Sequence, residues 1–123
     1  MERRGGKARA AGAAAAGARG RNGDIECAVA ARLYAEGKRA EAAEWLRKAA
    51  VRGHADAQCC LGELYQDGNG VSQSYKEAAE WFRKAADQGH ANAQCSLSGL
   101  FQHGNGVSQS YKEAAEWFRK AAD

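Results

Sequence analysis

The side chains in this sequence most able to do chemistry belong to four cysteines and three histidines. Thiolates and imidazoles bind metals and act as nucleophiles or bases. His54 and His90 each stand five residues before a cysteine, Cys59 and Cys95 respectively. Five helical residues rotate a side chain by roughly 140° about the axis, so neither pair is well placed to hold one metal ion. We therefore predict no metal site and interpret the histidines as helix-entry or surface residues; the other members of the set are Cys27, Cys60 and His103.

The cysteine spacing also argues against a disulfide scaffold or a catalytic centre. No CxxC pair occurs, and four cysteines in 123 residues are too sparse for a disulfide-rich secreted domain. We expect reduced, half-buried thiols. There is no Ser/His/Asp order or paired-acid arrangement, and Gly68 and Gly70 lack the lysine of a phosphate-binding loop. The sequence predicts a non-enzymatic protein with no catalytic residues, cofactor or metal.

The elements that position these side chains belong to an internal sequence repeat. The segments Gly53–Asp87 and Gly89–Asp123 are identical at 29 of 35 positions and are offset by 36 residues. Self-similarity at this period is typical of a solenoid of stacked helical hairpins.

Each repeat reads as two helices joined by a glycine turn. In the second repeat, apolar residues recur at steps of three and four before the Gly68-Asn69-Gly70 turn. Ser74 followed by Glu77 is a capping box that opens the next helix, and Ser110 with Glu113 repeats it. With a shortened first hairpin, we expect six helices, over residues 25–35, 38–51, 55–66, 74–88, 91–102 and 110–123.

These elements define the predicted architecture. We expect an all-α protein, an α-solenoid of three antiparallel helical hairpins wound as a right-handed superhelix of the tetratricopeptide type. The predicted divisions are an Ala/Gly/Arg-rich leader over 1–23, a shortened hairpin over 24–52, and repeats over 53–88 and 89–123, the last incomplete at its C-terminal end.

The repeated residues resemble the Sel-1-like repeat, a longer relative of the tetratricopeptide repeat. The resemblance rests on Ala57-Gln58, Leu61-Gly62, Tyr65, Gly68, Gly70-Val71, Ala78, Trp81-Phe82 and Lys84-Ala85-Ala86. The third repeat departs from this pattern, with Ser98 at the position of Gly62 and Phe101 at that of Tyr65, and either change could loosen local helix packing. We assign structural roles to Leu61, Gly62, Tyr65, Gly68, Gly70, Trp81, Gly104, Gly106 and Trp117.

The resemblance implies a protein-interaction scaffold or adaptor whose helices present a groove to a protein or peptide segment. A cysteine-rich branch of the family pairs a cysteine that ends one hairpin with another that opens the next helix. Ala50 and Ala86 occupy the first of these positions here, so that pairing does not carry over. The candidate partner-binding residues are those off the apolar stripes: Asp56, Gln58, Glu63, Gln66, Asn92 and Gln94.

The charge distribution separates the leader from the repeats. Residues 1–23 contain six Lys/Arg and one Glu, whereas residues 24–123 contain 12 Lys/Arg and 14 Asp/Glu, so the balances are +5 and −2. We expect a disordered leader, since it has no aromatic or branched apolar residue. An organelle transit peptide and an electrostatic nucleic-acid contact are alternatives for it, and we otherwise favour a cytoplasmic location. The acidic balance of the repeats argues against a nucleic-acid partner.

The C-terminal hairpin is expected to lack a covering layer. Asp123 stands where the second repeat continues into a further helix, so Trp117 and Phe118 are predicted to be uncovered. We expect either that the chain is a fragment of a larger regulatory protein of this kind or that it self-associates through this hairpin.

Overall fold

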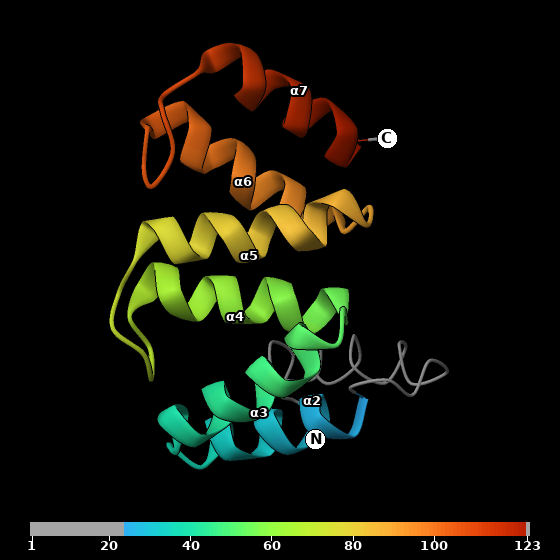
Figure 1. Cartoon of the computed structure of the whole chain (residues 1–123), viewed down its shortest axis with the longest axis vertical. Coiled ribbons are helices and arrows are strands. Elements are labelled where there is room, and N and C mark those ends of the chain that lie inside the picture. Colours follow the sequence, from blue (N-terminus) through green and yellow to red (C-terminus); the bar gives the residue numbers. More distant parts are fainter. Residues whose placement is uncertain (1–23, 123) are drawn as a thin grey trace, which may run out of the picture.

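A computed structural model of the chain describes residues 24–122, and the predictions made for residues 1–23 lie outside this part. It contains six helices: α2 (Asp24–Ala35), α3 (Arg39–Val51), α4 (Ala55–Asp67), α5 (Tyr75–Asp87), α6 (Ala91–His103) and α7 (Tyr111–Ala122). Each helix packs against the next in the chain, which gives three hairpins, α2–α3, α4–α5 and α6–α7 (Figure 1). The prediction of an all-α solenoid of three hairpins is confirmed, with helix bounds within one residue of those expected.

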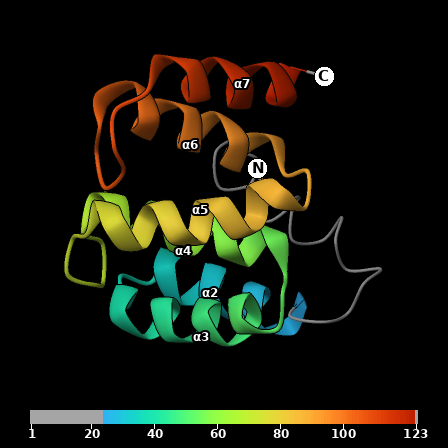
Figure 2. The same cartoon turned by 45° about the horizontal axis from the view of Figure 1, so that its top comes forward.

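The hairpins stack in chain order, from α2–α3 at one end to α6–α7 at the other (Figure 2). Close backbone contacts between successive hairpins help to set this order. Gly70 has a φ of +81°, and a Cβ built on it would stand 2.5 Å from the carbonyl oxygen of Arg39, at the start of α3. Gly106 makes the equivalent approach to Tyr75, at 2.3 Å. Only glycine allows both the left-handed conformation and a backbone contact this close.

Side-chain caps fix where four of the helices begin. The Ser74 hydroxyl accepts a hydrogen bond from the Glu77 amide at 3.1 Å, and Ser110 does the same for Glu113. At the start of α4 and α6 the cap is the imidazole Nδ1 of a histidine, which accepts from the amide three residues later. The donor–acceptor distances are 3.4 Å for His54 and 3.2 Å for His90. The repeated histidines therefore stand at helix entries, as the sequence indicated.

The core forms two adjoining clusters, one on each side of α4. The first joins α2, α3 and α4, and the second lies between α4–α5 and α6–α7. Phe82, Leu61 and Leu97 are the largest fully buried side chains. Tyr65 is half-buried against both clusters, while Trp45 and Trp81 are half-buried against the first cluster. These contacts hold the hairpins together as one stack.

The third hairpin differs from the second at one pair of positions. In the second hairpin the Phe82 ring lies over Gly62, and a Cβ at position 62 would stand 2.8 Å from the ring. The third hairpin has Ser98 at the equivalent position, and Ser98 is buried and donates a hydrogen bond to the Ala114 carbonyl at 2.7 Å. Phe118, the residue equivalent to Phe82, is 61% exposed.

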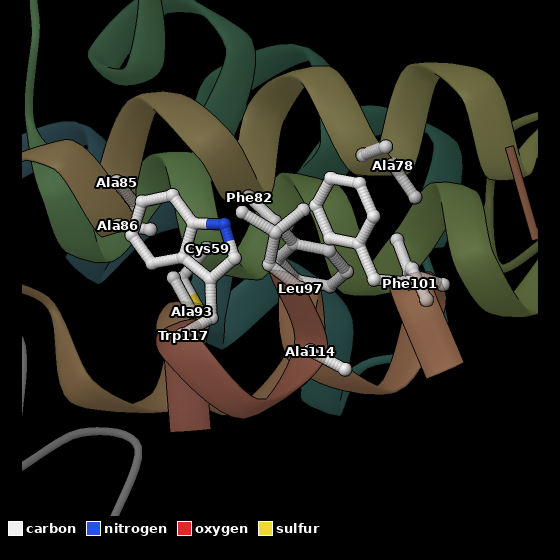
Figure 3. Close-up of a cluster of buried hydrophobic side chains, with 12 residues drawn as sticks. Cys59, Ala78, Phe82, Ala85, Ala86, Ala93, Leu97, Phe101, Ala114 and Trp117 are labelled. Carbon is white, nitrogen blue, oxygen red and sulfur yellow. The ribbon is translucent and has the colours of Figure 1, made fainter. Parts of the chain in front are cut away.

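The expectation that Trp117 and Phe118 would both be uncovered was half wrong. Trp117 is only 8% exposed. Its indole belongs to the second core cluster, where Figure 3 shows it beside Cys59, Ala86 and Ala93. Trp117 is therefore buried within the cluster between the second and third hairpins. Phe118 faces away from that junction and remains exposed.

Candidate protein-binding surface

Two of the residues predicted to contact a partner are inside the fold. Gln58 is 4% exposed and Gln94 is 7% exposed. The Gln58 amide donates to the Ala50 carbonyl at 3.1 Å, and the Gln94 amide donates to the Ala86 carbonyl at 3.0 Å. Both glutamines thus satisfy a carbonyl near the end of the preceding hairpin. We correct the prediction for these two residues: they join hairpins and are not available on the surface.

The sequence contained a signal for this burial. Gln58 precedes Leu61 by three residues and so lies on the same side of α4 as a fully buried leucine. Polar residues on an apolar face are buried when a partner satisfies them. The partner, a backbone carbonyl eight residues earlier, becomes adjacent only after the hairpins stack.

Asp56 is a surface residue with a defined partner. Its carboxylate lies 2.7 Å from Nε2 of His90. Nδ1 of His90 accepts a hydrogen bond from the Ala93 amide. The ring proton is therefore on Nε2, which donates a hydrogen bond to the Asp56 carboxylate. This contact links the first turn of α4 to the start of α6 across 34 residues of sequence. Sequence spacing did not indicate it, because the two residues belong to different repeats and meet only after the hairpins stack.

The remaining predicted residues lie on or near the surface. Glu63 and Asn92 are exposed and Gln66 is half-buried. Gln66 also lines an open depression of about 320 Å³ between the C-terminal end of α4 and the middle of α6. We call this depression the α4–α6 groove. Its lining residues are Gln66, Asp67, Tyr75, Cys95, Ser96, Gly99, Leu100, His103 and Asn105.

The groove owes part of its depth to Gly99. A Cβ at position 99 would meet nothing within 4 Å, and the equivalent residue of the second repeat is Glu63. The absence of a side chain at position 99 therefore leaves this part of the groove open.

Asp67 is the one carboxylate among the residues that line the groove, and none of them is a lysine or arginine. Helix α4 contains three carboxylates, Asp56, Glu63 and Asp67, and no lysine or arginine. Helix α6 contains neither acidic residues nor lysine or arginine, and its one titratable nitrogen base is His103. Asp67 ends α4, where the helix dipole adds further negative potential. This surface attracts positively charged groups.

The four cysteines, all within the described residues, form no disulfide with one another and differ in exposure. Cys27 and Cys59 are buried, whereas Cys60 and Cys95 are exposed. Burial, together with the negative charge of Glu63, raises the pKa of the Cys59 thiol far above its ordinary range. Cys59 therefore stays protonated and is a poor nucleophile or metal ligand. Within residues 24–122 no group of three or more His, Cys, Asp or Glu side chains is placed to hold a metal ion. None of the helices in the same part is long and apolar enough to span a membrane.

The segments of this chain that match a known protein family coincide with the three hairpins. A family model described as the Sel1 repeat matches residues 27–54, 55–90 and 91–123. No curated protein sequence matches this chain.

Several solved structures are similar to this chain. A Sel1 repeat protein from Oxalobacter formigenes is 42% identical with a TM-score of 0.65, covering 66% of this chain and 62% of that one. The protective antigen c5321 of uropathogenic Escherichia coli, which displays an SLR fold, is 32% identical with a TM-score of 0.77, covering 91% and 25%. Helicobacter pylori cysteine rich protein B is 26% identical with a TM-score of 0.64, covering 67% and 62%. This chain thus spans less than two thirds of the length of each.

Proposed function

Because the chain belongs to the Sel1 repeat family, we propose that it is a non-enzymatic interaction scaffold that binds a basic, extended segment of another protein. The binding site is the α4–α6 groove. The observation that supports this proposal is the open depression itself, which lies between two hairpins and is lined by polar side chains around a small apolar floor. Helical-repeat proteins use surfaces of this kind to receive partner segments.

The size of the groove favours a short peptide segment. A volume of about 320 Å³ is at the lower end of the range typical of small-molecule sites. It accommodates one or two side chains of a chain that continues along the surface. Leu100 and Tyr75 offer apolar contacts, and Ser96 and Asn105 offer hydrogen bonds.

The charge of the groove favours lysine or arginine in the partner. Asp67 lines the groove, and no lysine or arginine is among the other lining residues. Electrostatic complementarity of this kind accelerates association and selects among partners. The same charge repels a phosphate backbone, so the proposal does not extend to nucleic acid binding by the repeats.

A peptide titration with the full chain tests the proposal. The probe is a fluorescein-labelled peptide of arginine, leucine and serine, and its control is the same peptide with glutamate in place of arginine. We expect saturable binding of the basic peptide only, read as fluorescence anisotropy. Gly99→Gln should abolish most of this binding because it fills the groove without adding charge, and Asp67→Asn should weaken it several-fold.

A matched control distinguishes the groove from general acidity. Asp87 is an exposed acid at the end of α5 that does not line the groove. Asp87→Asn should bind the basic peptide as the unmodified chain does. Equal losses for Asp67→Asn and Asp87→Asn, or unchanged binding by Gly99→Gln, would refute the proposed site.

A further inference from the structure

Two arginines at equivalent positions of α3 and α5 have different partners. Arg47 of α3 donates a hydrogen bond to the Tyr65 hydroxyl, and its guanidinium carbon lies 5.7 Å from the centre of the Tyr65 ring. Arg83 of α5 lies over two rings, at 5.8 Å from the centre of Phe101 and 5.9 Å from that of Trp117. Phe101 stands where the previous repeat has Tyr65, so Arg83 meets no hydroxyl there. Within the part of the chain that the structure describes, Arg83 forms no hydrogen bond or ion pair, so its N–H donors remain available.

Arg83 lines a surface pocket of about 270 Å³ between α5 and the turn that joins α6 to α7. Lys76, Glu80 and Arg83 lie on one side of α5, at spacings of four and three residues, and form the polar wall of the pocket. Ala79 and Leu97 are buried residues at its base. We call this depression the α5 pocket.

Lys76 gives the α5 pocket a second positive charge that the junction between the first two hairpins lacks. The equivalent residue of α3 is Ala40. Glu80 is the one carboxylate that lines the pocket, and within residues 24–122 it forms no ion pair with Lys76 or Arg83. Two cations and one anion give the lining a net charge of +1. Lys76 is in the first turn of α5, where the helix dipole adds roughly half a positive charge.

We propose that the α5 pocket binds a phosphorylated serine or threonine side chain of a partner protein. A phosphoryl group carries about −1.5 to −2 charges at pH 7, which complements the charge of the lining and the helix terminus. Its oxygens match the planar fork of Arg83, which the rings of Phe101 and Trp117 support, and Lys76 supplies the second cation. The pocket is smaller than a typical small-molecule site, so it fits one side chain of a segment that continues over the surface.

This site is separate from the α4–α6 groove. The two depressions share no lining residue, and they differ in charge, because Asp67 is the one charged carboxylate or basic side chain besides His103 in the groove. A glutamate side chain is a poorer ligand for the α5 pocket than a phosphoryl group, since it offers a single charge and two acceptor oxygens to two cations. Variants of the α5 pocket should therefore leave binding of the basic peptide in the groove unchanged.

A phosphoserine peptide titrated into the full chain tests the proposal. The probe is a fluorescein-labelled peptide of alanine, serine and valine with one central phosphoserine, and its controls carry serine or glutamate at that position. We expect saturable binding of the phosphorylated peptide only, read as fluorescence anisotropy. Arg83→Gln should weaken this binding about tenfold or more, because it removes the charged fork. Arg83 is exposed, and circular dichroism verifies that the variant is folded.

Two matched variants distinguish the α5 pocket from general positive charge. Arg47→Gln removes the equivalent arginine of α3 and should leave binding unchanged. Phe101→Tyr supplies the hydroxyl that Tyr65 offers to Arg47, without changing the net charge. It should weaken binding several-fold, because the hydroxyl then occupies N–H donors of Arg83.

Several results would overturn the proposal. They are failure of the phosphopeptide to bind, equal binding by the glutamate peptide, unchanged binding by Arg83→Gln, and equal losses for Arg47→Gln and Arg83→Gln. Displacement of the phosphopeptide by an equal concentration of inorganic phosphate also overturns it, because the site then takes a free ion and not a protein segment. Binding to vesicles that contain phosphatidic acid, without binding to the phosphopeptide, assigns the pocket to a lipid headgroup and has the same consequence.

Discussion

Replacing Gly62 with alanine should destabilise the fold, whereas the same replacement at Gly99 should stabilise it. Both glycines lie within the first helix of a hairpin, α4 and α6 respectively. An alanine methyl at position 62 would stand 2.8 Å from the Phe82 ring, whereas at position 99 it would meet nothing within 4 Å. Both variants replace a helical glycine with alanine, so the difference between their unfolding free energies reports the contact between the methyl at position 62 and the Phe82 ring.

The magnitudes follow from two opposing effects. Alanine is favoured over glycine inside a helix by about 1 kcal/mol, so Gly99→Ala should raise the free energy of unfolding by about that amount. Gly62→Ala gains the same preference but forces an extra methyl against a ring that is 0% exposed. Overpacking a core costs about 1–3 kcal/mol, and an enclosed ring has little room to shift. We therefore expect a net loss of about 1–2 kcal/mol for Gly62→Ala.

Urea denaturation followed by circular dichroism and tryptophan fluorescence measures both variants. The two unfolding free energies should differ by at least about 2 kcal/mol, with opposite signs relative to the unmodified chain. The double variant Gly62→Ala/Phe82→Leu, which shortens the side chain that meets the methyl, should show a smaller penalty for alanine than the single variant does. If Gly62→Ala is as stabilising as Gly99→Ala, the close packing of Phe82 over Gly62 does not limit this position.

Three further predictions concern the turns, the caps and the thiols. Gly70→Ala should lower the free energy of unfolding, measured by urea denaturation, clearly more than Gly37→Ala does. Both glycines have a positive φ, which destabilises a substituted residue by about 1–2 kcal/mol. Only at Gly70 does the added methyl also clash with a backbone carbonyl. Equal costs would contradict this contact. Ser74→Ala should remove about 1 kcal/mol of stability through loss of the α5 cap, and Ser74→Asp should restore most of it in the same assay. Iodoacetamide followed by mass spectrometry should modify exposed Cys95 well before buried Cys59. Since the thiolate is the reactive form and the pKa of Cys59 is raised, its labelling should stay slow as the pH rises through the ordinary thiol range, and fast labelling there would show that the site is open.

Local patterns in the sequence were sufficient for the helices and their order. The repeat, the glycine turns and the Ser74 cap act within a few residues, so they could be interpreted without knowing which hairpins touch. The predicted helix bounds agree with α2 to α7 within one residue. Physically, backbone conformation at a turn or cap depends mainly on neighbouring residues.

The candidate site was less predictable because its contacts cross between hairpins. Gln58 looked like a surface residue until stacking brought the Ala50 carbonyl to 3.1 Å from its amide. Asp56 acquired His90 as a partner in the same way. The groove is open partly because position 99 is glycine and has no side chain. This opening forms only where α6 lies beside α4.

Helices α5 and α7 show which property the sequence alone does not determine. Their twelve shared residues determine, in both places, an amphipathic helix whose alanines and phenylalanine occupy one side. Tertiary structure decides whether that side is core or surface: α6 buries Phe82 completely, whereas Phe118 is 61% exposed. Helix formation depends on intervals of three and four residues along one segment. Burial depends on what another segment places against that side: α6 covers it on α5, whereas no helix within residues 24–122 covers it on α7.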